Sequence, residues 1–182
     1  MDTSIEFERK YILSFEQYKQ YFELLSRQVE LSAALQINYY YDDSHYILFE
    51  RNETLRVRQI GEKLTLEYKH SKEHFGNVRK SEENAISISS LPQKITIDSI
   101  KATMIGCLLT QRSDFLFDDI KVSLDKSFYL GMVDYELEIE TNGSDELPHF
   151  LSSLTEIANC SPMGKYRRFV SKLRAMDTTY EI

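Results

Sequence analysis

The feature that most constrains this chain is an alternation of charged and apolar side chains, first seen at residues 5–10 as Ile-Glu-Phe-Glu-Arg-Lys. Successive side chains of a β-strand point to opposite faces, so Glu6, Glu8 and Lys10 share one face. Two carboxylates and an ammonium in a row are costly to bury unless they pair or hold something. Carboxylates about 7 Å apart along a strand suit a divalent cation. A solvent-exposed edge strand would carry the same charges, so this segment alone does not distinguish a metal-binding face from an exposed one.

Seven further segments repeat this pattern or have the aromatic content of strands, and we expect each to be a strand. In the last of them, four carboxylates alternate with apolar residues, and such a row is destabilising without counter-charge. The seven segments are residues 35–42, 54–58, 64–69, 78–85, 110–117, 120–125 and 134–140.

The segments 54–58 and 64–69 flank a Gly-Glu-Lys turn and read as a hairpin. Its polar face would gather two arginines, a glutamate and a lysine. In the strand 78–85, either Arg79, Ser81 and Glu83 or Lys80, Glu82 and Asn84 point to the same side as the other charged faces. We favour the first arrangement. The residues of the hairpin's polar face are Arg56, Arg58, Glu67 and Lys69.

Helices are expected between and after the strands. Ser14 and Gln17 form a capping box before an apolar stripe at helical spacing. Residues 96–109 are also predicted to be helical, with Cys107 as a core thiol. The remaining predicted helices are residues 146–158 and a basic helix that opens near 165–168 and ends at about Arg174.

Composition bounds the class of protein. A chain of 182 residues with 42% hydrophobic and 28% charged residues fits one soluble domain, which we place at 1–176 with a frayed tail at 177–182. The net charge of -7 argues against nucleic-acid binding, which needs a basic footprint. No apolar run reaches membrane-spanning length, so no membrane partner is expected. Two cysteines suit a reducing cytoplasm, where we expect the protein.

The strand pattern favours an inverted barrel. The fold class we predict is α+β, with a closed eight-stranded antiparallel β-barrel whose charged faces point inward and whose apolar outer faces are flanked by α-helices. Small barrels normally hold apolar side chains inside. A charged interior would instead be a wet tunnel with an acidic wall for metal and a basic wall for phosphate.

The ordered motifs resemble those of the CYTH superfamily, the triphosphate tunnel metalloenzymes, which include class IV adenylate cyclases, thiamine triphosphatases and inorganic triphosphatases. The most specific match is the opening Glu-x-Glu-x-Lys, at Glu6, Glu8 and Lys10. The fifth strand departs from the family's usual Arg-x-Glu-x-Glu, because Ser81 stands in the middle. The supporting matches are Tyr40-Tyr41-Asp42, Leu55 to Arg58, Lys69, Leu124-Asp125, and Gly131 followed by Glu136 to Glu138.

The resemblance implies an eight-stranded antiparallel tunnel that holds Mg2+ or Mn2+ and a triphosphate. By position, the implied metal ligands are Glu6, Glu8, Glu136 and Glu138. The implied phosphate-binding residues are Lys10, Arg56, Arg58, Lys69, Arg79 and Arg112, with Lys165 and Arg167 closing one end. The implied catalytic residues are Glu8, Lys10, Glu136 and Glu138, and the sequence does not choose which glutamate orients the attacking water.

The resulting hypothesis is a divalent-metal-dependent hydrolase of a small-molecule triphosphate. One alternative is a class IV-type adenylate cyclase that makes cyclic AMP from ATP, although no base-reading motif is evident. Another is a non-enzymatic polyphosphate- or nucleotide-binding protein. The sequence leaves open a homodimer formed through the outer face, the substrate and the metal preference.

Overall fold

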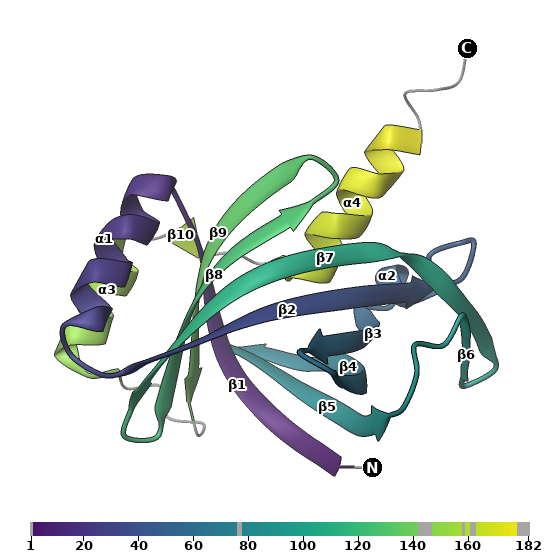
Figure 1. Cartoon of the computed structure of the whole chain (residues 1–182), viewed down its shortest axis with the longest axis horizontal. Coiled ribbons are helices and arrows are strands. Elements are labelled where there is room, and N and C mark those ends of the chain that lie inside the picture. The colour runs from purple at the N-terminus through teal and green to yellow at the C-terminus, as the bar shows by residue number, and fades with distance from the viewer. Residues whose placement is uncertain (1, 76–77, 142–146, 158, 161–162, 178–182) are drawn as a thin grey trace.

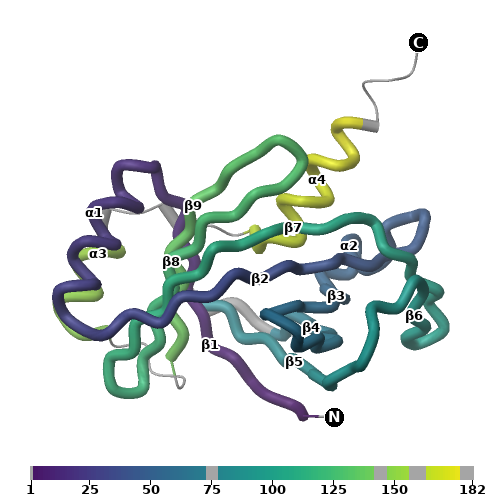
Figure 2. The backbone as a smooth tube through the Cα atoms, viewed as in Figure 1, coloured from purple at the N-terminus to yellow at the C-terminus, as the bar shows by residue number. Residues whose placement is uncertain are grey.

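The strands of this protein form one antiparallel sheet that closes on itself. The computed structural model describes residues 2–75, 78–141, 147–157, 159–160 and 163–177 (Figures 1 and 2). The strands are β1 (Asp2–Leu13), β2 (Leu31–Asp42), β3 (Glu53–Ile60), β4 (Lys63–Phe75), β5 (Val78–Ile88), β6 (Lys94–Ile97), β7 (Ile100–Phe117), β8 (Ile120–Tyr129), β9 (Met132–Thr141) and β10 (Asn159–Cys160). The helices are α1 (Phe15–Ser26), α2 (Ile47–Glu50), α3 (His149–Ile157) and α4 (Lys165–Asp177).

The barrel consists of the eight strands that the sequence predicts. Their order is β1-β5-β4-β3-β2-β7-β8-β9, and pairing of β1 with β9 closes the ring, with Lys10 opposite Glu138. The closed α+β barrel is therefore confirmed. Two short strands were not predicted, since β6 pairs with β7 and β10 pairs with β1 at the margins of the ring.

The register places opposite charges next to each other on the inner face. Glu8 lies opposite Arg79 on one side, and Arg56 lies opposite Glu67. Arg112 likewise lies opposite Asp125. Cross-strand neighbours stand about 5 Å apart, and the last two pairs form ion pairs that neutralise charge inside the ring.

Helices α1 and α3 cover the outer face of one side of the barrel, where β1, β7, β8 and β9 meet (Figure 1). The predicted capping box is present, because the Ser14 side chain accepts from Gln17 and the Gln17 side chain accepts from Ser14. Tyr21 and Leu25 of α1 are fully buried against apolar side chains of these strands. Each such burial contributes about 1.5–3 kcal/mol, so this layer holds the ring closed from outside.

The outer face of β2, β3 and β4 is covered differently from the prediction. Residues 96–109 are not a helix; they belong to the β6–β7 hairpin, which turns at Asp98 and Ser99 with positive φ. A bulge near Tyr40 and Tyr41 shifts the register of β7, so Ala102 packs outward and Leu108 inward. Because alternate residues of β7 switch faces at the bulge, the spacing of its apolar residues resembles that of a helix. Cys107 is consequently exposed and free, not a core thiol.

Helix α4 fills one end of the barrel from the inside. Tyr166, Phe169 and Val170 pack against Tyr40 and Leu108, which lie on the inner face of β2 and β7. The interior is therefore charged over most of its length and apolar where α4 enters. The helix runs to Asp177, so the expected frayed tail lies outside the described residues apart from that one position. No described helix combines the length and apolarity needed to span a membrane.

Candidate active site

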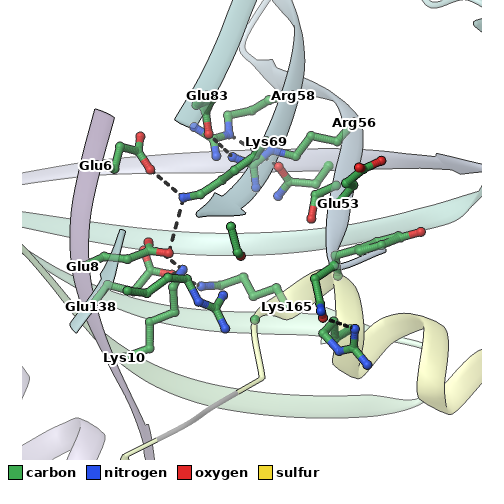
Figure 3. A pocket seen from close by; sticks show the side chains of 18 of the residues that line it. Glu6, Glu8, Lys10, Glu53, Arg56, Arg58, Lys69, Glu83, Glu138 and Lys165 are labelled. Atoms are coloured by element: carbon green, nitrogen blue, oxygen red, sulfur yellow. Dashed lines mark hydrogen bonds and ion pairs between the residues drawn. The ribbon is translucent and has the colours of Figure 1, made fainter. Parts of the chain in front are cut away.

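The charged interior encloses a cavity of about 580 Å³ (Figure 3). Its walls come from all eight barrel strands, from the α2–β3 connection and from the start of α4. Apart from Gly164 and Tyr166, every lining side chain is polar or charged. The lining residues are Glu6, Glu8, Lys10, Gln36, Asn38, Arg51, Asn52, Glu53, Thr54, Arg56, Arg58, Lys69, Ser71, Lys72, Arg79, Glu83, Thr110, Arg112, Lys121, Glu138, Glu140, Gly164, Lys165, Tyr166 and Arg167.

Two lysines hold the glutamates of β1. Lys69 Nζ lies 2.5 Å from Glu6 Oε2 and 3.3 Å from Glu8 Oε1, and Figure 3 shows it between the two. Lys10 Nζ lies 2.9 Å from Glu8 Oε2 and 3.0 Å from Glu138 Oε1. Burial alone would raise the pKa of Glu8, but the ammonium groups of Lys10 and Lys69 outweigh it and lower that pKa to about 2. Glu8 is therefore an anion at neutral pH.

The β3–β4 hairpin supplies guanidinium groups with unequal partners. Arg56 Nε donates to Glu67 Oε2 at 2.6 Å, with Glu83 at 3.6 Å. Arg58 has looser contacts, at 3.4 Å to Asn38 Oδ1 and 3.4 Å to Glu67 Oε2. Burial, followed by repulsion from Arg56, lowers the pKa of Arg58. Arg58 is thus a cation whose charge is incompletely neutralised and which faces the cavity.

A deeper acidic group lies beneath the cavity floor. Carboxylate oxygens of Asp125, Glu136 and Glu138 lie within 4.8 Å of one another. Lys165 Nζ contacts all three, at 2.8 Å in the case of Asp125 Oδ2. Arg112 binds Asp125 through two parallel hydrogen bonds of 2.8 and 2.6 Å and also reaches Glu138. Of the three acids only Glu138 also lines the cavity.

The Tyr-Tyr-Asp motif of β2 docks α4. The Tyr166 hydroxyl donates to Asp42 Oδ2 at 2.5 Å, and Asp42 also accepts the Leu48 and Phe49 backbone N–H groups. Arg167 donates to the Phe49 carbonyl at 2.9 Å and stacks over the Phe49 ring. The motif therefore positions the start of α4 at one end of the bore, and its own three residues do not line the cavity.

The structure brings the predicted site residues together around the cavity, with one exception. Glu136 is 1% exposed and lies behind Lys165, so it does not line the cavity. Sequence reasoning missed Gln36 and Asn38, which the period-2 pattern of β2 would have placed inward. It also missed the rim at 51–54, where the turn at 51–52 passes into the first residues of β3 and leaves no periodic signal. The predicted residues that line the cavity are Glu6, Glu8, Lys10, Arg56, Arg58, Lys69, Arg79, Arg112, Glu138, Lys165 and Arg167.

The donor chemistry of this site fits a hard divalent cation. Glu6, Glu8 and Glu138 offer carboxylate oxygens, and the described lining of the cavity contains no cysteine or histidine. Such ligands suit Mg2+ or Mn2+. The lysines now paired with these carboxylates are flexible single-point donors, which exchange partners more readily than a bidentate arginine.

A closed barrel with a charged bore, an acidic wall and a basic wall defines a family of proteins. The family model described as the CYTH domain matches residues 4–169, so this chain belongs to the CYTH family. A Bacillus subtilis (strain 168) protein named as a candidate triphosphatase, YjbK, is 28% identical over 152 residues, covering 77% of this chain and 79% of that protein.

Solved structures share the fold. A candidate adenylate cyclase from Bacillus halodurans superposes with a TM-score of 0.73 at 23% identity, covering 93% of this chain and 99% of that one. The Hippeastrum protein HpAC1, named as a candidate adenylyl cyclase and described as having a dominant triphosphatase activity, gives 0.73 at 20% identity, covering 91% and 95%. At these identities the likeness supports the barrel architecture.

Proposed function

We propose that this protein is a metal-dependent triphosphatase. The observation that carries the proposal is the cavity itself. Inside one closed ring, cations with incompletely neutralised charge, such as Arg58, face carboxylates that are ionised, such as Glu8. A triphosphate carries negative charge along its length, and a divalent cation links phosphate oxygens to carboxylates. The triphosphatase names of YjbK and HpAC1 support the same assignment.

The roles we propose follow from position in the bore. Arg56, Arg58 and Arg79 bind phosphate oxygens as forked donors, while Lys10 and Lys69 act as point charges. Arg112, Lys165 and Arg167 add positive charge at the α4 end. Glu6, Glu8 and Glu138 hold Mg2+ or Mn2+, which supplies charge neutralisation at the transferring phosphoryl group when bound.

The protein's own groups then position the reactants. The guanidinium groups fix the phosphate chain, so the reaction gains from orientation and from preorganised positive charge. The low pKa of Glu8 keeps its carboxylate ionised, which suits a metal ligand better than a general base. Glu138 is similarly ionised, because Arg112, Lys10 and Lys165 overcome its burial and lower its pKa. Either carboxylate orients water by accepting a hydrogen bond from it.

The lining favours a bare phosphate chain as substrate over a nucleotide. Among the lining residues the structure describes, Tyr166 is the single aromatic and no aliphatic side chain occurs; Tyr166 itself is 4% exposed. Stacking on an aromatic ring is the usual means of holding a base, and the described lining offers no exposed ring for it. We therefore propose inorganic triphosphate as the preferred substrate and disfavour the cyclase, which must hold adenine.

A substrate panel tests this function. Purified protein with Mg2+ or Mn2+ would be given inorganic triphosphate, thiamine triphosphate, ATP and long polyphosphate, with phosphate release and cyclic AMP both measured. We expect metal-dependent phosphate release, with kcat/KM highest for inorganic triphosphate. Cyclic AMP plus pyrophosphate from ATP would favour the cyclase. Tight triphosphate binding without metal-stimulated release would favour a binding protein.

The cellular setting is a separate proposal. Two cysteines in 182 residues, with Cys107 a free thiol on the surface, support a reducing compartment such as the cytoplasm. Fractionation of the native host, followed by immunodetection, would test this, and recovery with secreted material would contradict it.

A further inference from the structure

The ammonium of Lys165 lies at the centre of the deep acidic group. It contacts Asp125 on β8 and Glu136 and Glu138 on β9, with Asp125 Oδ2 at 2.8 Å. The Lys165 side chain is 9% exposed, and the three acids are still less exposed. Lys165 therefore reaches through the cavity floor into a buried nest of oxygen atoms.

This nest has the composition of a metal site. Three carboxylates from neighbouring strands place oxygens within 4.8 Å of one another, a spacing that a divalent cation bridges readily. Three buried carboxylates without a cation at their centre would repel one another at high cost. Arg112 and Arg168 approach the group from its edges, with Arg168 Nη2 at 2.7 Å from Glu136 Oε2. Of the residues that the structure describes, Lys165 is the one that contacts all three.

Helix α4 fixes the ammonium in place. The residue after Lys165, Tyr166, is tied to Asp42, and Arg168 donates to Asp134 Oδ2 at 2.9 Å. A free ion exchanges with solvent, whereas this cation is covalently part of a docked helix.

We propose that the ammonium of Lys165 takes the place of a second divalent cation, so that the bore of this protein binds one metal ion. The inference rests on the proposed function for the location of that one ion, at Glu6, Glu8 and Glu138. An ammonium supplies positive charge to a phosphate chain but does not lower the pKa of water as a metal does. Activation of the attacking water would then fall to the single ion on the β1 side.

The test counts bound Mn2+ by equilibrium dialysis and electron paramagnetic resonance, without substrate. Three proteins are compared: the wild type, Lys165→Met, which keeps the apolar stem without the charge, and Lys121→Met as a matched control. Lys121 also lines the cavity, but its one ion-pair partner among the described residues is Glu140, at 3.2 Å. We expect one ion in the wild type, two in Lys165→Met with coupled spin signals, and one in Lys121→Met.

The outcomes separate the inference from the proposed function. A folded Lys165→Met that binds no more Mn2+ than the wild type overturns the inference. Two ions in the wild type overturn it as well. No ion in the wild type but one in Lys165→Met would support Lys165 as the occupant of the second cation position, but it would contradict the proposed metal site on β1 and with it the count of one ion.

A second variant covers failure of Lys165→Met to fold, which circular dichroism would reveal. Glu136→Gln removes one of the three carboxylates and leaves Lys165 in place. The inference makes Glu136 a partner of Lys165 and not a ligand of the single ion. We therefore expect Glu136→Gln to bind one Mn2+ with an affinity within about threefold of the wild type; loss of that ion would overturn the inference.

Discussion

Gly106 of β7 lies directly against Phe169 of α4, where a β-carbon on residue 106 would stand 2.7 Å from Phe169 Cζ. Gly106 also has a φ of +147°, which side-chain-bearing residues rarely adopt. Both facts lie at the bulge where β7 changes register beside Tyr40. The absence of a side chain at this point lets α4 seat inside the barrel.

The first prediction is that Gly106→Ala loosens α4. The added methyl group clashes with an aromatic ring in a packed layer, and such overpacking costs about 1–3 kcal/mol. Hydrogen exchange of the amides in α4 should accelerate while that of β3 and β4 is unchanged. Gly131→Ala is the control, because Gly131 also has positive φ but has nothing within 4 Å of its β-carbon position. Equal effects of the two variants on α4 would contradict the conclusion that close contact between residue 106 and Phe169 holds α4 in place.

The second prediction concerns the β1 glutamates. Glu6→Gln combined with Glu8→Gln should abolish metal-stimulated phosphate release, because neutral amides are poor ligands for hard cations. The barrel should persist, since its closure depends on backbone pairing and on the apolar outer layer. Phosphate release with Mg2+ or Mn2+ and far-ultraviolet circular dichroism measure the two effects. Full activity in the double variant would remove the enzymatic proposal.

The third prediction contrasts two arginines of the bore. The partners of Arg58 among the described residues are loose, at 3.4 Å, so Arg58→Ala should barely change stability yet weaken triphosphate binding. Loss of a hydrogen bond to a charged group costs about 1.5–3 kcal/mol, which corresponds to about a 10- to 100-fold rise in KM.

Arg112 is the counterpart of Arg58 in this comparison. It holds Asp125 and Glu138 at 2.5–2.8 Å within the buried group. Removing one partner of a buried ion pair costs about 3–5 kcal/mol, so Arg112→Ala should lower the free energy of unfolding by that amount. Urea denaturation and KM for inorganic triphosphate, measured on both variants, check the contrast. A large loss of stability in Arg58→Ala would contradict the assignment of its 3.4 Å contacts as weak.

The sequence predicts the barrel well because alternation has a direct physical meaning in a strand. In β1, β3 and β4 the charged residues recur with period 2, and this places Glu6, Arg56 and Lys69 on one inner face without knowledge of the pairing. The capping box at Ser14 and Gln17 is equally local, so its prediction needed no tertiary information.

The remaining features depend on contacts that no local pattern encodes. The β6–β7 hairpin resembles a helix in sequence because Ala102 and Leu108 serve two different apolar layers on opposite faces. The place of Glu136 beneath the cavity floor follows from Lys165, which is 29 residues away in the chain. Alternation predicts that Glu136 and Glu138 face inward, but not which of them a docked helix will cover.

The last prediction is a pH dependence carried by Glu8. Its pKa is lowered from 4.5 to about 2 in the folded protein, so the ionised carboxylate stabilises the fold above pH 4.5. That contribution is lost as the pH falls from 4.5 toward 2. At 1.36 kcal/mol per pKa unit it amounts to about 3 kcal/mol at pH 7 and about 1.5 kcal/mol at pH 3.

Urea denaturation of the wild type and of Glu8→Gln at pH 7 and pH 3 would measure this change. The difference in unfolding free energy between the two proteins should shrink by about half at the lower pH. Burial raises the pKa of Glu136, but that residue is present in both proteins, so its titration cancels from the difference. Glu62→Gln, in the exposed β3–β4 turn, serves as the control and should show no such change. A difference between wild type and Glu8→Gln that is independent of pH would mean that Lys10 and Lys69 do not hold Glu8 as an anion.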